Sequence, residues 1–525
     1  MIEKILNKVW QIKLFYKYIN FNKNNLIHIN SKKKETREII LLELFDIKAF
    51  ILSSSLFCTA LKSKKNYKII GYFPNFLRIK NEIKFLINWY FNIFSSMQFF
   101  KSFGMTKFII PKKNSQSKNL LKTYNKIINN IKSKKDVLNL KIDSVLIGDI
   151  VYDTYLREND LITINISDKK FKEFIFNTVC LFYTWKSFFK KNKVNSIISS
   201  HSVYLTALPL RVAMKYNINT FCVNHHGAYR LSKKKPLVWG NFEDYPKLFK
   251  ALPNTIKKKG VLFAKSNLTK RFTGHKDILY KISNPIKKSI FLPEKRLKKK
   301  VIKESKNFKI LIAAHDFNDA PHVHKDLIFE DMYEWLNYLG ELSNSKEHFD
   351  WYIKLHPSEY DENYEKMKFI INKYNKLKLL PKYISHNQIV KEGINCVLTC
   401  YGSIGHEYPF FKIPVINAGH NPHIGYNFNY NPKNKKEYDN LISQIRFLKV
   451  NKNYKNQIYE FYTVRFFLDY ALFNDIHDAK LFNEMYIFDI FLKRFDEKKI
   501  KKTLKDYSTF IMSKKRRLIN YDQIN

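Results

Sequence analysis

The chain has 525 residues, 45% of them hydrophobic, which is too long for one ordinary core and predicts two folded domains. A formal net charge of +47 favours an anionic partner, which could be nucleic acid, an anionic membrane face or an acidic polymer, unless the lysines are simply spread over the whole surface. Because the sequence has no zinc-finger spacing, no aromatic RNA-binding strand and no P-loop, nucleic acid is not an expected partner.

Strand-like and helix-like segments alternate through the first half of the chain. Strands are predicted over 39–42, 68–72, 144–148, 195–201 and 220–224, and an amphipathic helix over 115–135. This repeated strand–helix order is typical of a parallel sheet with helices on both faces.

A charged, coil-like stretch over 293–306 is the predicted linker. A second strand–helix series begins at 308–314, and its later strands end at Leu355, near Leu379, at Thr399 and at Ile416. Residues 435–495 are predicted to be helical. We therefore predict an α/β protein with two doubly wound, Rossmann-like domains over 1–295 and 306–450, followed by C-terminal helices and a basic tail over 451–525.

The cellular location is predicted from the cysteines and from the apolar segments. Five scattered cysteines favour a reducing compartment over a disulfide scaffold. The N-terminus lacks the continuous apolar core of a signal peptide, and the most apolar stretch, 85–100, is shorter than a membrane span. The prediction is a cytoplasmic protein without a transmembrane helix, which leaves open a peripheral position at the inner face of the membrane.

The first candidate site loop ends a predicted strand with Lys354, His356 and Pro357. Proline fixes the turn, so the imidazole is held at the edge of the sheet. A histidine there can donate to a phosphate oxygen or protonate a leaving group, and Lys354 adds positive charge. The alternative is that His356 only ends a loop.

The second candidate loop contains Gly402, Ser403 and Glu407. Glycine permits a close approach of backbone N–H groups to a phosphate at a helix start, and Glu407, one turn after Ser403, could accept from ribose hydroxyls. The alternative is a turn glycine and a solvated helix charge.

Together, the Lys-Leu-His-Pro loop, the Gly-Ser-(x)3-Glu loop and the Pro-Val-Ile that follows resemble bacterial capsule-polysaccharide glycosyltransferases. The same pattern occurs in relatives that use CMP-activated sialic acid or Kdo and in CDP-glycerol transferases. The resemblance covers about 310–420 and implies a GT-B fold, with an acceptor domain at 1–295 facing a nucleotide-donor domain at 306–450. Gly402-Ser403 departs from relatives that carry paired hydroxyl residues at this position.

The resemblance also implies roles for these residues. His356 and Pro357 would meet the CMP phosphate, with His356 as a candidate acid, Ser403 would hold phosphate, and Glu407 would hold the ribose. The nucleotide-sugar is a substrate, so no cofactor is implied, and GT-B enzymes usually need no metal ion.

Further polar residues are predicted near the cleft. His315, Asp316 and Asp319 follow the first strand of the second series, in a loop that matches no standard metal template, so a divalent metal is not expected. Asp153 is the candidate base that deprotonates an acceptor hydroxyl, and Asp149, one turn earlier, is an alternative helix cap. His201 and His226 follow two other strands and are candidate acceptor contacts.

The leading functional hypothesis is a glycosyltransferase that moves a sugar from a nucleotide-activated, CMP-linked donor to a cell-surface polysaccharide or lipid-linked acceptor in capsule or lipopolysaccharide synthesis. The first alternative is transfer of a polyol phosphate from a CDP-glycerol-type donor. The second is a non-catalytic glycan-binding or assembly protein.

Overall fold

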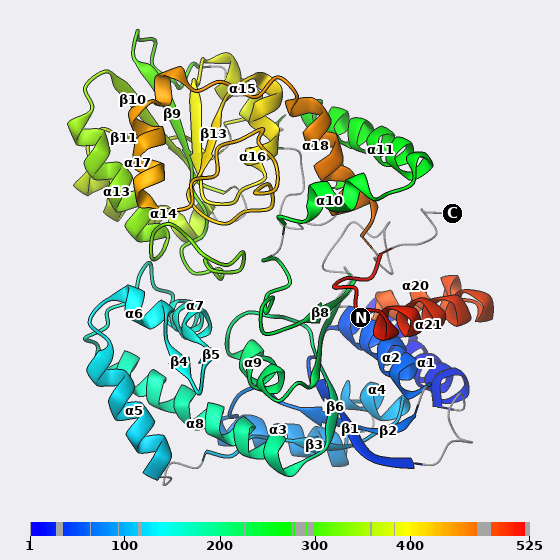
Figure 1. The fold of residues 1–525 in the computed structure, drawn as a ribbon. Helices are drawn as coiled ribbons and strands as arrows, with labels where there is room; N and C mark the ends of the chain where they lie inside the picture. Colours follow the sequence, from blue (N-terminus) through cyan, green and yellow to red (C-terminus); the bar gives the residue numbers. More distant parts are fainter. Residues whose placement is uncertain are drawn as a thin grey trace.

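The computed structural model describes residues 2–27, 35–63, 65–92, 94–113, 118–224, 227–240, 242–275, 277–278, 290–291, 299–356, 360–382, 384–469 and 485–519. Two mainly parallel sheets lie one above the other, the first in the N-terminal half of the chain and the second in the C-terminal half (Figure 1). The predicted α/β class with two Rossmann-like units is confirmed.

The N-terminal sheet has the strand order β3-β2-β1-β6-β7-β8. Only the pairing of β8 with β7 is antiparallel among its neighbouring strands. The strands are β1 (Glu35–Glu43), β2 (Asn66–Tyr72), β3 (Met105–Ile109), β6 (Val194–Ser199), β7 (Asn219–Asn224) and β8 (Gly227–Leu231).

Both faces of this sheet are buried, which explains the continuous apolar run in β1. Ile40 and Leu42 point into one hydrophobic cluster, and Ile39 and Leu41 point into another on the opposite face. The first face is covered by α1 (Ile2–Asn22), α2 (Lys48–Lys62) and α4 (Met97–Ser102), and the second by α5 (Lys118–Asn130), α7 (Gly148–Glu158), α8 (Lys169–Lys191) and α9 (Leu208–Lys215). Shorter or peripheral helices are η1 (Lys23–Ile27), α3 (Ile79–Tyr90), α6 (Lys134–Leu138) and η3 (Leu205–Ala207).

The C-terminal sheet is parallel in every pairing and has the order β11-β10-β9-β12-β13. Its strands are β9 (Phe308–Ala313), β10 (Phe349–Lys354), β11 (Leu377–Leu379), β12 (Cys396–Thr399) and β13 (Val415–Asn417). Its helices are α13 (Met332–Ser345), α14 (Tyr360–Lys373), α15 (His386–Lys391), α16 (Ile404–Glu407), η4 (Tyr408–Phe411), α17 (Lys435–Ser443) and η5 (Ile445–Phe447). In both sheets the strand order reverses beside the first strand, at β1/β6 and at β9/β12, which is where α/β sheets bind ligands.

The predicted sheet strand at 144–148 is wrong. The chain forms a small antiparallel hairpin, β4 (Lys141–Ile142) with β5 (Val145–Leu146), and α7 begins immediately afterwards at Gly148. The cause is the left-handed backbone at Asp143 (φ 50°) and Ser144 (φ 66°), which makes a two-residue turn and reverses the chain. Asp149 therefore lies in the first turn of a helix and not at a sheet edge.

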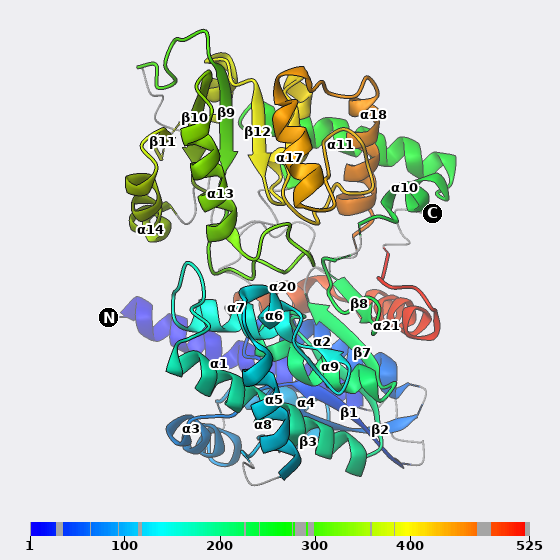
Figure 2. The ribbon, with the colours of Figure 1, turned by 60° about the vertical axis from the view of Figure 1, so that its left-hand side comes forward.

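Within each half, helices from distant parts of the sequence pack together. The C-terminal half contains α10 (Tyr245–Lys250) and α11 (Asn254–Phe272), which contact α18 (Tyr454–Tyr462) and η6 (Thr463–Phe467). The last helices, α20 (Tyr486–Arg494) and α21 (Glu497–Met512), return to the N-terminal half and pack on α1 and α2 (Figures 1 and 2). The predicted linker falls mostly outside the described residues, so the domain boundary there stays a prediction.

α11 packs so closely on η6 that Gly260 leaves no room for a side chain, and this packing can be tested. A Cβ at this position would lie 2.1 Å from Thr463 Cγ2. Alanine normally favours a helix over glycine by about 1 kcal/mol, whereas overpacking costs about 1–3 kcal/mol. We expect Gly260→Ala to lower the urea midpoint of unfolding, and Thr463→Ala in the same chain to restore part of it. A gain in stability for the single variant would contradict this packing.

None of the helices in the described ranges is both long enough and apolar enough to cross a membrane.

Candidate functional site

A cavity of about 530 Å³ lies at the carboxyl edge of the N-terminal sheet. It borders the ends of β1, β6 and β7, and the loop after β9 closes it from the other half. Its lining includes Glu43, Phe45, Arg157, Ser200, His201, Tyr204, Asn224, Trp239, Asp319 and Val323. The cavity therefore occupies the reversal point β1/β6, between the two halves.

Three side chains in this cavity form a hydrogen-bonded chain. Glu43 Oε2 accepts from Ser199 Oγ at 2.7 Å, from the Ser200 N–H at 2.7 Å and from Ser200 Oγ at 2.8 Å. Ser200 Oγ also lies 2.6 Å from His201 Nδ1. Because the single hydroxyl proton of Ser200 is given to Glu43, Nδ1 of His201 must be the donor to Ser200, which leaves Nε2 with a free lone pair.

The protonation of His201 suits a proton acceptor. His201 is an exposed residue, yet desolvation by the surrounding protein lowers its pKa below the usual range, with Glu43 opposing this effect and Arg157 adding to it. The imidazole is therefore neutral at neutral pH and can take a proton at Nε2. His201, predicted as a cleft contact, is thus placed in the cavity, together with the buried Glu43, which the sequence analysis missed.

The lining of the same cavity includes an ion pair between the two halves. Arg157 Nη1 donates to Asp319 Oδ1 at 2.5 Å and to Tyr204 Oη at 2.6 Å, and Tyr204 Oη donates to Asp319 Oδ1 at 2.9 Å. Tyr204 has a φ of 56°, a left-handed conformation that costs energy for an aromatic residue and is found most often at functional sites. The predicted cleft residue Asp319 therefore does border the cleft.

A cluster of basic side chains lies at the edge of the C-terminal sheet, around the end of β10. It consists of Lys354, His356, Arg271 from α11 and His386 from α15. The positive charges of Lys354 and Arg271 lower the pKa of both histidines. Burial lowers the pKa of His356 to about 4, and Lys354 and Arg271 add to this effect. The same causes, with His356 added, hold the pKa of His386 well below its usual range. An anionic ligand bound here would favour the charged forms of these groups and raise their pKa values.

Lys354 is the member of this cluster best suited to bind an anion. Only 6% of the residue is exposed, and within the described ranges its Nζ has no hydrogen-bond or ion-pair partner. Burial lowers the pKa of Lys354 to about 8, so the amine is still charged at neutral pH. Arg271, by contrast, is already paired with Glu407 and, at 3.2 Å, with Asp277.

Next to this cluster, aromatic and histidine rings fill the reversal point β9/β12. His315 Nε2 lies 3.0 Å from Thr399 Oγ1, and its ring centroid is 4.3 Å from that of Tyr401. A Cβ on Gly402 would lie 3.2 Å from His315 Cε1, so the glycine permits this close approach. The predicted residues His315 and Gly402 are therefore in contact, although they are far apart in the sequence.

The loop at 402–407 is more enclosed than its sequence suggests. The helix α16 has four residues, and Ser403 immediately precedes it. Glu407 is fully buried and is ion-paired with Arg271. Its predicted contact with a ribose would require this ion pair to open.

Asp153, the predicted base, is buried in a pair that joins the two halves. Its Oδ1 accepts from His322 Nδ1 at 2.6 Å, and its Oδ2 accepts from the His322 N–H at 3.2 Å. Only 2% of Asp153 is exposed, so proton abstraction from an acceptor would require the pair to separate. The neighbouring Asp149 accepts from Arg211 Nη2 at 2.5 Å.

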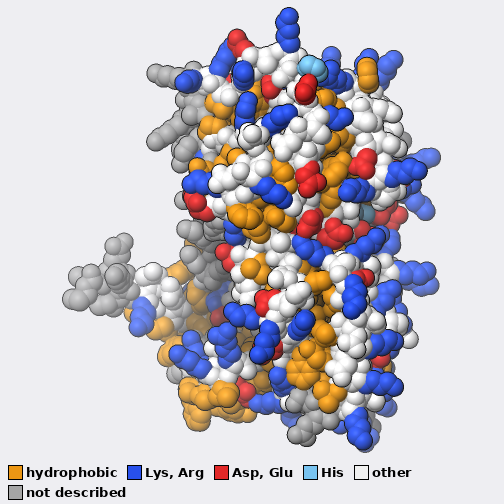
Figure 3. Space-filling model, turned by 90° about the vertical axis from the view of Figure 1, so that its left-hand side faces the viewer, with side chains coloured by type: hydrophobic (Ala, Val, Ile, Leu, Met, Phe, Trp, Pro, Cys, Tyr) orange, Lys and Arg blue, Asp and Glu red, His pale blue; other side chains and the backbone are white. Residues whose placement is uncertain are grey.

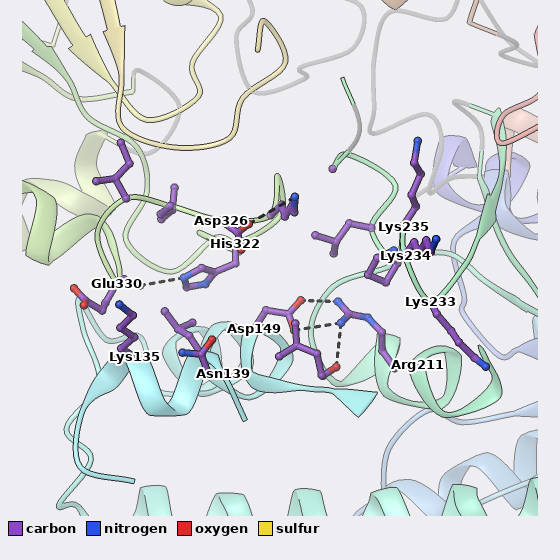
Figure 4. A pocket seen from close by; sticks show the side chains of 18 of the residues that line it. Lys135, Asn139, Asp149, Arg211, Lys233, Lys234, Lys235, His322, Asp326 and Glu330 are labelled. Atoms are coloured by element: carbon purple, nitrogen blue, oxygen red, sulfur yellow. Dashed lines mark hydrogen bonds and ion pairs between the residues drawn. The ribbon is translucent and has the colours of Figure 1, made fainter. Parts of the chain in front are cut away.

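A second cavity, of about 410 Å³, lies beside this pair, between α6, α9 and the loop after β9 (Figure 4). Arg211 and His322 line it with five lysines, Lys135, Lys233, Lys234, Lys235 and Lys325, against the acids Asp149, Asp326 and Glu330. His322 Nε2 donates to the Glu330 carbonyl at 3.0 Å in its wall. The excess of cations makes this cavity suitable for an anionic group.

The remaining predicted residues fall into two groups. Pro357 and His226 lie outside the described residues. Asp316 lies in the loop after β9, where its Oδ1 accepts from the Asn318 N–H at 3.1 Å. No three His, Cys, Asp or Glu side chains in the described ranges gather as a metal-ligand set.

No protein-family model and no curated protein sequence matches the chain. Among solved structures, UDP-GlcNAc 2-epimerase from Neisseria meningitidis bound to UDP-GlcNAc is 10% identical, with a TM-score of 0.21, and the match covers 87% of this chain and 100% of that one. The UDP-GlcNAc 2-epimerase of Methanocaldococcus jannaschii in complex with UDP-GlcNAc and UDP is 10% identical, with a TM-score of 0.22 and coverages of 83% and 99%. Anabaena HepE in complex with UDP and glucose is 9% identical, with a TM-score of 0.23 and coverages of 86% and 99%.

Proposed function

We propose that this protein is a glycosyltransferase that moves a sugar from a nucleotide-activated donor to a glycan acceptor, with a CMP-linked sugar as the first candidate donor. The observation that carries the proposal is the pairing of a base and an anion site on facing sheet edges. His201, held by Ser200 and Glu43, presents a free Nε2 on the N-terminal side. Lys354, which has no hydrogen-bond or ion-pair partner among the described residues, lies with its basic neighbours on the C-terminal side.

In this proposal each edge has one chemical task. His201 takes the proton of the acceptor hydroxyl as that oxygen attacks the sugar carbon. Lys354 stabilises the negative charge that grows on the leaving phosphate as the glycosidic bond to the nucleotide breaks. His356 completes the phosphate site, and Gly402 and Ser403 could donate to the phosphate from beside it once their present hydrogen bonds to Thr399 and Glu407 open. Asp153 has a positioning role instead, since it holds the loop after β9 through His322.

The acceptor is proposed to be a cell-surface polysaccharide or a lipid-linked glycan. The cavity next to His201 is large enough for a sugar unit, and the lysine-lined cavity beside it suits acidic groups on a polymer. Analysis of the product for phosphorus distinguishes sugar transfer from transfer of a polyol phosphate.

Calorimetric titration with CMP, CDP, UDP and GDP tests the donor site. We expect binding with a preference for the cytidine nucleotides, and we expect Lys354→Met or His356→Ala to abolish most of it. Lys378→Met is the matched control, because Lys378 is an exposed residue on the adjacent strand β11. A preference for UDP or GDP would be consistent with a transferase but would contradict a cytidine-linked donor. If folded protein bound none of these nucleotides, the proposal would be overturned.

The pH dependence of nucleotide binding gives a second check on Lys354. A phosphate binds the charged amine, and the pKa of Lys354 without ligand is lowered to about 8. Affinity should be constant below that pH and fall above it, by about tenfold at one unit higher, with proton uptake on binding. Titrations at neutral and alkaline pH in two buffers of different ionisation enthalpy measure both effects. A pH-independent affinity would exclude Lys354 from the site.

A further inference from the structure

The outer side of α3 is an exposed row of large hydrophobic residues. Ile79, Ile83 and Ile87, spaced four residues apart on one side of the helix, are 78%, 52% and 52% exposed. The opposite side of the same helix buries Phe85 and Trp89, whose rings pack on Phe108 with centroids 4.8 Å away in both cases. The helix is thus anchored through one side and presents a second apolar side that the described residues do not cover.

This row continues onto the N-terminal helix α1. Phe94 lies 6.0 Å from Phe15 and 6.1 Å from Tyr16, measured between ring centroids, so the segment after α3 adjoins α1. The apolar face defined in this way comprises Leu6, Val9, Trp10 and Tyr16 of α1 with Ile79, Ile83, Ile87, Tyr90, Phe91 and Phe94. It holds ten of the eighteen exposed large hydrophobic residues in the described ranges, which is a concentration typical of an interaction surface. Figure 3 shows hydrophobic side chains gathered at the lower left of the molecule.

Cations flank the apolar face. Arg78, Lys80 and Lys84 are exposed on and beside α3, and Lys8, Lys13 and Lys17 are exposed on α1. The single acidic residue of α3, Glu82, is ion-paired with Lys112. The face therefore combines apolar residues, aromatic residues with polar tips and a positive fringe.

We infer that this apolar face docks on an anionic lipid bilayer, with α3 and α1 lying in the plane of the interface. Side chains such as Trp10, Tyr16 and Tyr90 suit the boundary between headgroups and acyl chains, and the flanking cations suit anionic headgroups. The net charge of the chain argues against a second copy of the protein as the partner that covers this apolar face. Two copies that each carry a net charge of +47 would bring their lysine fringes together.

This inference concerns a surface and not the cleft, so it goes beyond the proposed function and can fail separately from it. If both hold, the N-terminal half, which carries His201 and its cavity, is kept at the membrane where a lipid-linked acceptor resides. Loss of nucleotide binding with vesicle binding intact would overturn only the transferase proposal.

Flotation of the full-length protein with phosphatidylcholine vesicles, with and without phosphatidylglycerol, tests the docking surface. We expect flotation with the anionic vesicles and weakening of this binding at high salt. Ile83→Asp/Ile87→Asp and, separately, Lys80→Glu/Lys84→Glu should each reduce the vesicle-bound fraction at least tenfold. The matched controls Phe369→Asp/Phe447→Asp and Lys391→Glu/Lys452→Glu change exposed residues in the C-terminal half, the two phenylalanines being more exposed than Ile83 and Ile87, and should bind like the native chain.

Two results would overturn the inference. The first is equal vesicle binding by the native chain and the Ile83→Asp/Ile87→Asp variant, or no binding to anionic vesicles by the native chain. The second is a dimer, measured by light scattering without lipid, that the same variant dissociates, because the apolar face would then join two copies. Circular dichroism of each variant confirms that it is folded, as expected for changes at exposed positions.

Discussion

Replacing His201 by alanine is expected to slow sugar transfer by about 10²- to 10⁴-fold, the usual contribution of a general base, while nucleotide affinity stays unchanged. The reason is that Nε2 of His201 is held free by the chain of hydrogen bonds through Ser200 to Glu43. His348→Ala, at an exposed histidine of the C-terminal half, is the matched control. Steady-state rates with the donor identified by titration, together with calorimetry, measure the two effects separately.

The pH profile distinguishes a base from a residue that only shapes the cavity. Because the pKa of His201 is lowered, the base is already neutral at neutral pH, and the rate should fall only as the pH drops through that lowered pKa. The acidic limb should disappear in His201→Ala and shift in Glu43→Gln. If Asp153→Asn stopped catalysis in a folded protein while His201→Ala did not, the base would be Asp153.

Replacing His322 by glutamine is expected to lower the free energy of unfolding by about 3–5 kcal/mol, the usual effect of breaking a buried ion pair. Asp153 and His322 are 2% and 5% exposed, and the loss of one partner leaves the other charge buried. Both ring nitrogens of His322 face acceptors, Asp153 Oδ1 and the Glu330 carbonyl, so the ring is doubly protonated when both hydrogen bonds form. Equilibrium urea denaturation measures the change.

A matched comparison is available in the same interface. Arg157 and Asp319 also join the two halves, but their side chains are 55% and 60% exposed, so Arg157→Ala should cost only about 0–1 kcal/mol. Burial disfavours the charged ring of His322, yet Asp153 raises its pKa above the usual value. The contribution of the charged ring is therefore complete below the usual histidine pKa and is lost as the pH rises through the raised one. Equal costs for the two variants, or a cost for His322→Gln that grows with pH, would contradict this account.

The strands could be predicted where burial on both faces leaves an uninterrupted apolar run, as at residues 39–42 of β1. The segment 144–148 also contains an apolar run, Val145 to Ile147, but it forms the second strand of a hairpin and a helix start, because two left-handed residues reverse the chain just before it. Strand ends were informative for the site as well. Lys354, His356 and His201 were chosen as candidates because each follows an apolar run that stops abruptly, and their roles stay predictions.

The partners of these residues could not be predicted. Arg271 meets Glu407 across 136 positions, and Asp153 meets His322 across 169, so neither pair leaves a local signal. Glu43 directly follows a predicted strand and could have been found by its position. Its role depends on Ser200, which only the pairing of β1 with β6 brings near.

Because α20 and α21 pack in the N-terminal half, the core of that half is incomplete while the chain is still being synthesised. The core around α2 includes Phe488, Phe491, Tyr507 and Phe510, and Arg230 donates to the carbonyls of Ile511 and Ser513 at 2.8 and 3.1 Å. A ribosome adds about 5–20 residues per second, so the strands of the first sheet emerge well before the helices that cover them. We expect the second half to complete its core first, although it is made later, because the core of the first half stays incomplete until α20 and α21 have been made. A chain stopped just before α20 would then be degraded even though both sheets are present.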